Sequence, residues 1–565
     1  MVNTAWMCLK SKEAELFRET PLMSARFLRP LCLAVCCALL LIACSRKHEA
    51  ESPSAVLAAP SAREHVMERK LAEPPKPASA PGQAAHQAPS ETARYDEYKD
   101  NAFQEVVTAP LSTFGLDMDT ASYANVRRFL NQGRMPNQDA VRVEEMLNYF
   151  PAGRDMLSRL GDSPFSASYE LAPCPWNPKN LLLYLTLKAD DVRADRRPRS
   201  NLVFLVDVSG SMNPPERLPL VKSLLKVLAS NLGSGDTVSL VTYSGGTQVV
   251  LGPTSGADKA AILAAVDRLE AGGGTAGASG LALAYEQAQK GFIKGGVNRV
   301  LLCTDGDFNL GVTDPKQIQT MVEKGRDAGI TLSALGFGSD NYNESLMVRI
   351  ADNGNGNYSY IDTLSEGRKV LGEEMTATLT TVAKDAKAQI EFNPARVQAY
   401  RQIGYEKRQL KAEDFNNDTV DAGDIGAGKR VTILYELVPA GTAAPKVDPS
   451  RYGTTPAVSR DFSNELAFVK IRWKAPHGDK SKLASLPITK APAQNFAQAG
   501  EPLRFAAAVA AYGQKLRGNP ELGNTSWSDI AGWGRGASSD DPGGWKSEFV
   551  RLVGLAESLA PKTSR

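Results

Sequence analysis

The chain has 565 residues, which is too long for one ordinary domain and favours about three. Hydrophobic residues make up 42% of the chain and charged residues 23%, the usual balance of a globular protein. The formal net charge of +2 gives no reason to expect nucleic acid or another acidic polymer as a partner.

The first segment with a clear pattern is a secretory signal at residues 23–43. Arg26 and Arg29 precede a wholly apolar run from Leu31 to Ile42. A run of about a dozen residues is too short for a membrane span but typical of a signal peptide. Residues 1–22 contain three glutamates and fit no signal peptide. We therefore expect a mis-assigned start, with translation beginning at residue 23.

The signal ends in a sequence that resembles a bacterial lipobox, Leu41-Ile42-Ala43-Cys44. The resemblance implies that cleavage leaves Cys44 as a lipidated first residue, which anchors the protein to an envelope membrane, facing the periplasm. A plain cleaved signal is the alternative. Ser45, in place of aspartate, favours the outer membrane over the inner one. Residues 44–95 are rich in Ala, Pro and Ser with almost no aromatics, so a disordered tether is expected.

Residues 96–155 are expected to form a small N-terminal module. Apolar residues recur at helical spacing in residues 122–132 and 140–150. The run Asp117-Met118-Asp119-Thr120 precedes the first helix and is similar to the DxDT of haloacid dehalogenase-type phosphatases. Because the module is far too short for that fold, we expect Asp119 or Thr120 to cap the helix instead.

Residues 156–197 are expected to supply strands to a flanking β domain. Residues 198–382 then alternate strands with helices, for example a strand at 236–243 followed by a helix at 258–269. This alternation predicts an α/β domain with a doubly wound, mostly parallel, Rossmann-like sheet. On such sheets, ligands bind outside the carboxyl ends of the strands.

Oxygen-bearing side chains follow two apolar strands of this domain. Asp207-Val208-Ser209-Gly210-Ser211 comes directly after residues 202–206, and Asp305 comes directly after residues 300–304. A glycine-rich loop ending in Thr275 adds a third hydroxyl. We expect both carboxylates at solvent-facing strand ends. Two carboxylates with three alcohols suit Mg²⁺, or Mn²⁺ or Ca²⁺ in its place. The alternative is that the hydroxyls only cap helices. The predicted metal ligands are Asp207, Ser209, Ser211, Thr275 and Asp305.

This ligand set resembles the von Willebrand factor type A (VWA) family and its metal-ion-dependent adhesion site. The resemblance implies that the hydroxyls touch the metal and that the aspartates act largely through water. It also implies an open coordination position, which the acidic side chain of a protein partner fills.

The chain is expected to become β-rich after the VWA domain, in residues 383–565. We propose that strands before residue 190 and after residue 385 share one β-sandwich, with the VWA domain inserted in it or flanked by it. The last segments, residues 503–516 and 546–559, show the spacing of amphipathic helices.

A wider resemblance covers nearly everything after residue 95. The segments 110–128 and 414–428 resemble the N-terminal module and the C-terminal domain of a bacterial lipoprotein family with a single VWA domain. The resemblance implies the architecture and leaves the activity open, because a fold does not imply a function.

Enzyme chemistry finds little support in the residues. The chain has four histidines, none of them in residues 198–382, and no Walker-type phosphate loop. A Ser-His-Asp hydrolase, a histidine-based zinc site and a nucleotide site are therefore not expected. Two cysteines, Cys174 and Cys303, lie beyond the lipobox, and no spacing rule supports a disulfide between them.

These observations predict a non-enzymatic, lipid-anchored envelope protein that binds an acidic protein partner through a divalent metal. The first alternative is a structural or assembly scaffold of the envelope whose metal site is not essential. The second is a metal-dependent hydrolase.

Overall fold

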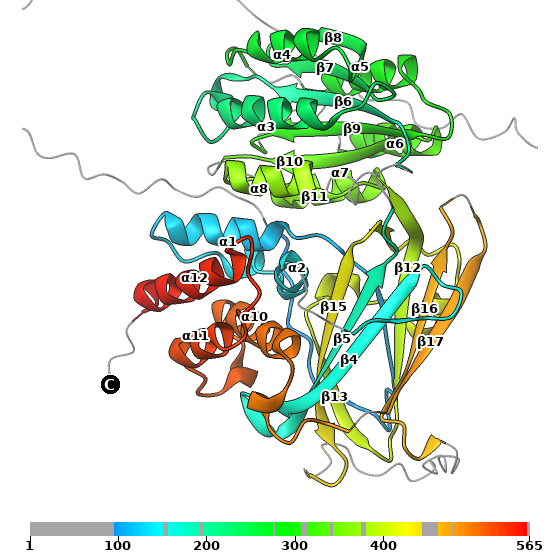
Figure 1. Cartoon of the computed structure of the whole chain (residues 1–565), viewed down its shortest axis with the longest axis vertical. Helices are drawn as coiled ribbons and strands as arrows, with labels where there is room; N and C mark the ends of the chain where they lie inside the picture. Colours follow the sequence, from blue (N-terminus) through cyan, green and yellow to red (C-terminus); the bar gives the residue numbers. More distant parts are fainter. Residues whose placement is uncertain are drawn as a thin grey trace, which may run out of the picture. The chain divides into compact units, whose positions relative to one another are not determined.

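The computed structural model describes residues 95–150, 156–192, 197–274, 277–306, 315–338, 343–373, 380–442, 462–476, 478–489 and 491–561. Figure 1 shows three regions in this part of the chain: an α/β domain, a body of β-strands and a group of helices. The lipobox and Thr275 lie outside the described residues.

The α/β domain is built on a six-stranded sheet with the order β11-β10-β9-β6-β7-β8. Its strands pair in parallel, except for the edge pair β7–β8, which is antiparallel. Strands β6 and β9 are neighbours in the middle of the sheet. From β6 the chain goes on to β7 and β8 on one side, and from β9 it goes on to β10 and β11 on the other side. The strands are β6 (Ser200–Asp207), β7 (Thr237–Tyr243), β8 (Thr247–Ser255), β9 (Val297–Thr304), β10 (Thr331–Gly336) and β11 (Tyr358–Tyr360).

Helices cover both faces of this sheet (Figure 1). One apolar core includes Leu224 and Ile262 from one set of helices, and a second includes Leu281 and Met347 from the other set. The doubly wound sheet predicted from the alternation is therefore present. The first set is α3 (Leu218–Asn231), α4 (Lys259–Asp267) and α8 (Leu364–Arg368); the second is α5 (Gly277–Lys290), α6 (Pro315–Asp327) and α7 (Glu344–Asn353).

The β body consists of two sheets that share one apolar core. In the first sheet, β5 (Asn177–Ala189) pairs with β15 (Arg430–Pro439), although the whole α/β domain separates them in the chain. The remaining strands of this sheet are β1 (Gln104–Glu105), β3 (Ser158–Arg159), β4 (Phe165–Cys174) and β13 (Val397–Ile403). The second sheet holds β2 (Leu111–Gly115), β12 (Thr381–Phe392), β14 (Gly423–Gly426), β16 (Ala467–Lys474) and β17 (Ser481–Ile488).

Helices from the two ends of the described chain pack into one cluster. The Phe150 ring lies 4.9 Å from that of Phe505 and 5.8 Å from that of Phe549, centroid to centroid. The module at residues 96–155 therefore shares its core with the C-terminal helices. The members are α1 (Ala121–Asn131), α2 (Val143–Tyr149), α10 (Glu501–Arg517), α11 (Trp527–Arg535) and α12 (Trp545–Leu559).

The structure corrects the expected side-chain cap of α1 and answers whether Cys174 and Cys303 form a disulfide. Thr120 occupies the N-cap of α1, but its side chain makes no capping hydrogen bond. Asp117 Oδ1 accepts the backbone N–H of Asp119 at 2.9 Å, in the turn before the helix, so it does not cap α1 either. Cys174 and Cys303 are both buried and free, so they form no disulfide with each other. Within the described residues, the helices are too short or too polar to cross a membrane.

Candidate metal centre

Asp207 is the last residue of β6, and Asp305 follows the last residue of β9. The two strands are neighbours at the point where the strand order reverses, which is where open α/β sheets bind their ligands. Asp207 Oδ1 accepts the backbone N–H of Ser209 at 2.9 Å, and Oδ2 accepts the hydroxyl of Thr304 at 3.2 Å. Both carboxylate oxygens are therefore held in a fixed orientation.

The two serine hydroxyls lie together beside this carboxylate. Ser209 Oγ and Ser211 Oγ are 3.0 Å apart. Backbone hydrogen bonds tie their loop to the glycine-rich loop, from Gly210 N to Gly273 O at 3.1 Å and from Gly272 N to Val208 O at 2.8 Å. The loop that precedes Thr275 is thus fixed against the serines, while Thr275 itself lies outside the described residues.

An arginine that the sequence did not single out completes the described centre. Arg217, directly before α3, donates through Nη1 to Asp305 Oδ2 at 2.8 Å and to the carbonyl of Ser211 at 2.6 Å. Its side chain is 7% exposed and that of Asp305 is 4% exposed. No local pattern marks Arg217, because its partner lies 88 residues further along the chain.

The carboxylates are buried, which corrects the expectation that they face solvent: Asp207 is 0% exposed and Asp305 is 4% exposed. Burial raises the pKa of the Asp207 carboxyl to about 6, and the negative charge of Asp305 adds to the rise. Hydrogen bonds from Ser209 oppose it. A buried carboxylate without a full counter-charge costs free energy that a bound cation recovers.

The described donor set fits a small, hard divalent cation. Asp207 and Asp305 supply two negative charges and Arg217 one positive charge, so these three side chains carry a net charge of −1. Two adjacent hydroxyls stand beside them. Oxygen ligands of this kind suit Mg²⁺, Mn²⁺ or Ca²⁺ and offer nothing to a soft metal. If a dication bound here, Asp207, Ser209 and Ser211 would hold it.

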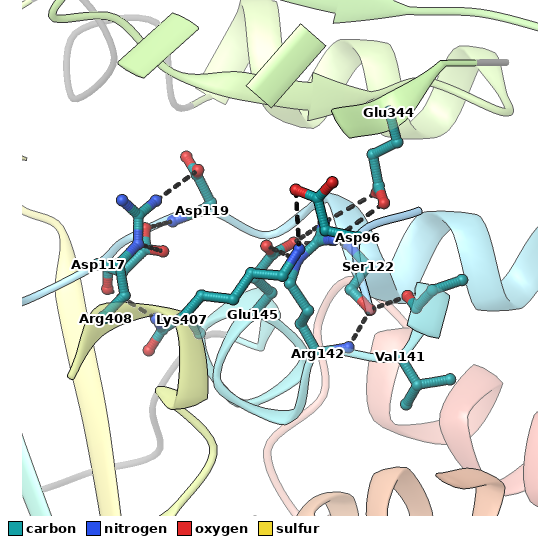
Figure 2. A network of polar contacts seen from close by, with 12 residues as sticks. Asp96, Asp117, Asp119, Ser122, Val141, Arg142, Glu145, Glu344, Lys407 and Arg408 are labelled. Carbon is teal, nitrogen blue, oxygen red and sulfur yellow. Dashed lines mark hydrogen bonds and ion pairs between the residues drawn. The ribbon is translucent and has the colours of Figure 1, made fainter. Parts of the chain in front are cut away.

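A second acidic cluster lies in the N-terminal module (Figure 2). Asp117, Asp119 and Glu145 each place one oxygen within 4.8 Å of the others. Two guanidinium groups already pair with it: Arg408 Nε donates to Asp117 Oδ2 at 2.8 Å and its Nη2 lies 3.7 Å from Asp119, and Arg142 pairs with Glu145. The cluster is an ion-paired contact, so the DxDT-like run has a structural role.

The same arginines connect the module to helix α7 of the α/β domain. Figure 2 shows Arg142 reaching from Glu145 to Glu344, to which it donates two hydrogen bonds of 2.8 and 2.9 Å. Arg127 makes the corresponding contact near α8, at 2.7 Å to Glu366 and 2.5 Å to Asp362. Buried ion pairs at α7 and at α8 therefore join the α/β domain to the N-terminal module.

Three family models match parts of the chain. The von Willebrand factor type A domain matches residues 201–372, a family described as von Willebrand factor matches residues 89–184, and "Uncharacterized protein YfbK, C-terminal" matches residues 377–559. Uncharacterized protein YfbK of Escherichia coli (strain K12) is 54% identical over 487 residues, which cover 85% of this chain and 84% of that protein. The chain belongs to the YfbK family. The predicted VWA domain and C-terminal domain are thus confirmed.

Solved structures give more distant similarities. A von Willebrand factor type A protein from Catenulispora acidiphila is 16% identical, covers 73% of this chain and 100% of its own, and has a TM-score of 0.38. Proximal thread matrix protein 1 from the mussel byssus, solved with a zinc-occupied MIDAS motif, is 22% identical, covers 33% of this chain and 46% of its own, and has a TM-score of 0.27.

Proposed function

We propose that the protein is a lipid-anchored envelope protein that binds a protein partner through a divalent cation at the Asp207 centre. Mg²⁺ is the proposed cation, and an acidic side chain of the partner is its last ligand. The observation that carries this proposal is the buried carboxylates of Asp207 and Asp305, of which Asp305 is ion-paired with Arg217, beside two adjacent hydroxyls. This arrangement lowers the stability of the protein when no cation is bound, because a buried carboxylate is costly without a cation.

The chemistry of the centre supports recognition over catalysis. Asp207 has both oxygens engaged by Ser209 and Thr304, and Asp305 is ion-paired. Neither is placed as a general base for an attacking water, which has to be in hydrogen-bond reach of a basic group with capacity to accept its proton. The proposal is therefore that the protein is not an enzyme. A turnover screen with Mg²⁺ or Mn²⁺ present tests this point.

Thermal unfolding in Mg²⁺, Mn²⁺ or EDTA tests metal binding. A cation that binds only the folded protein stabilises it by about 2.7 kcal/mol at a hundredfold excess over Kd, which raises Tm by several degrees. Asp207→Asn should abolish this rise. Asp267→Asn, at an exposed position at the end of α4, is the control and should retain it. A wild-type Tm that is the same in all three solutions would contradict the proposal.

A scaffold role is the second candidate, and the ion-paired contacts of α7 and α8 favour it. They bind the α/β domain to the N-terminal module through Arg142 and Arg127. The two roles differ in their dependence on metal. In capture experiments from solubilised envelope, recognition requires Mg²⁺ and an intact Asp207, whereas scaffold contacts persist in EDTA and in Asp207→Asn.

A further inference from the structure

We infer that Arg217 sets the charge of the metal centre. It holds Asp305 as an ion-paired acceptor, so that the centre would keep a positive charge when a dication is bound and would select an anionic ligand. This inference rests on the proposed function and names the residue that determines what the centre binds.

The position of Arg217 is built into the fold around it. Nη1 bridges the Ser211 carbonyl, at 2.6 Å, and Asp305 Oδ2, at 2.8 Å. Gly338 makes room for the side chain: its φ is +76°, and a Cβ there would come within 2.3 Å of Arg217 Nε. The Arg217 side chain is only 7% exposed, so bulk water screens its charge weakly. Arg217 is therefore a fixed part of the centre.

The charge balance gives the consequence. Counted over the described side chains, a dication held by Asp207 and by two uncharged hydroxyls would leave a net charge of +1, because Arg217 cancels Asp305. Without Arg217 the two carboxylates would cancel the dication, and an incoming carboxylate would gain no net attraction. With Arg217 the metal binds more weakly by itself and more strongly together with an anion. The ligand that completes the charge is a monoanion such as a carboxylate.

Asp305 is thereby distinguished from Asp207. Both oxygens of Asp207 accept hydrogen bonds from its own site, from Ser209 and Thr304. Asp305 Oδ2 instead accepts a hydrogen bond from the guanidinium of Arg217. If that pairing is the role of Asp305, neutralising Asp305 and Arg217 together should preserve the metal site, because the pair carries no net charge.

The test is a double-mutant cycle with Mn²⁺ as the probe, measured by titration calorimetry on the full chain. Arg217→Gln should tighten Mn²⁺ binding about tenfold, Asp305→Asn should weaken it about tenfold, and the double variant should stay within about threefold of wild type. Arg217→Lys keeps the charge and is the conservative control, also within about threefold.

Acetate is the second probe, because a structural role for Arg217 would not alter anion preference. Acetate at constant ionic strength should tighten Mn²⁺ binding to wild type and to Arg217→Lys, but not to Arg217→Gln. A double variant as weak as Asp305→Asn alone would overturn the inference, because Asp305 would then be needed as a ligand whatever its partner. Unchanged Mn²⁺ affinity in Arg217→Gln would also overturn it.

Two further results keep the outcomes separate. If Arg217→Gln unfolds, the double variant and Arg217→Lys still decide the question, since neither leaves Asp305 as a carboxylate without a cationic partner. If wild type binds no Mn²⁺, the proposed function itself fails. If wild type binds Mn²⁺ and only the cycle fails, the proposed function stands and the role of Arg217 does not.

Discussion

Gly273 imposes a backbone requirement at the metal centre. Its φ is +81°, a left-handed conformation that is unfavourable for any residue with a side chain. An added Cβ would lie 3.2 Å from Ser244 Oγ. The carbonyl of Gly273 also accepts the N–H of Gly210, so a strained Gly273 would displace the loop that carries both serines.

We expect Gly273→Ala to destabilise the protein by about 1–2 kcal/mol and to weaken Mn²⁺ binding. Gly272→Ala is the matched control, because a Cβ at that glycine would meet nothing within 4 Å. Urea unfolding measures the first effect and calorimetry the second. Equal losses in the two variants would show that the conformation of Gly273 does not matter.

Glu406 links stability to pH. Burial raises its pKa from 4.5 to about 8, and the negative charge of Glu144 adds to the rise. Asp100 acts in the same direction, and Arg517 opposes it. The folded protein therefore holds a proton that the unfolded chain releases above its ordinary pKa. The stabilisation from this proton is complete below about pH 4.5 and is lost as the pH rises toward 8.

Glu406→Gln replaces the protonated acid with a neutral group of the same shape. We expect its Tm to exceed that of wild type at pH 8 and the difference to shrink toward pH 5. The exposed Glu413 supplies the control substitution Glu413→Gln, which should leave the pH profile unchanged. A constant difference between Glu406→Gln and wild type from pH 5 to pH 8 would refute the assignment.

At the scale of elements, α7 is attached to the N-terminal module through one buried ion pair. Arg142 is 3% exposed and Glu344 is 1% exposed, and two hydrogen bonds join them. Removing one partner of such a pair leaves a buried charge uncompensated, which typically costs about 3–5 kcal/mol. An exposed pair contributes far less, since water already solvates both groups.

Arg142→Met should therefore lower the free energy of unfolding by about 3–5 kcal/mol. The control is Glu286→Gln, which breaks the exposed pair with Lys290 within α5 and should cost less than about 1 kcal/mol. Chemical unfolding of both variants measures the difference. Similar small losses in the two would indicate that α7 does not depend on this contact.

At the scale of the whole molecule, the α/β domain has a complete sheet and two cores of its own. Residues 198–382 should thus fold as an isolated fragment. In the full chain, however, Ala121 and Ala124 of α1 join the core on the α7 side, and Arg127 pairs with Glu366. The fragment loses these contacts, so we expect a lower Tm than in the full chain but the same rise of Tm with Mn²⁺. A fragment without a cooperative unfolding transition would contradict its independence.

The proposed anchor depends on one residue. Cys44→Ser should release the protein from membranes into the soluble fraction, because a lipid chain needs the cysteine thiol for attachment. Cys32→Ser, in the apolar run of the signal, changes the same atom type and should leave the protein with the membranes. Fractionation followed by a high-salt wash measures both. A Cys44→Ser protein that still sediments with membranes would rule out the lipid anchor.

The sequence by itself determined the α/β domain and the carboxyl-end position of Asp207 and Asp305. Both follow from local patterns: a buried strand is a continuous apolar run, and its end is where polar residues begin. The sequence also indicated that strands on the two sides of this domain belong together, and β5 does pair with β15. Thr275 and Cys44 lie outside the described residues and stay predictions.

Only the tertiary structure decided how these carboxylates are neutralised. Asp305 meets Arg217 across 88 residues, and Arg142 meets Glu344 across 202. No periodicity or spacing marks such pairs, because an ion pair depends on distance in space and on burial, which folding alone creates. For the same reason the burial of Asp207 and Asp305 was missed: the sequence shows where a strand ends, whereas the loops folded over that end decide whether water reaches it.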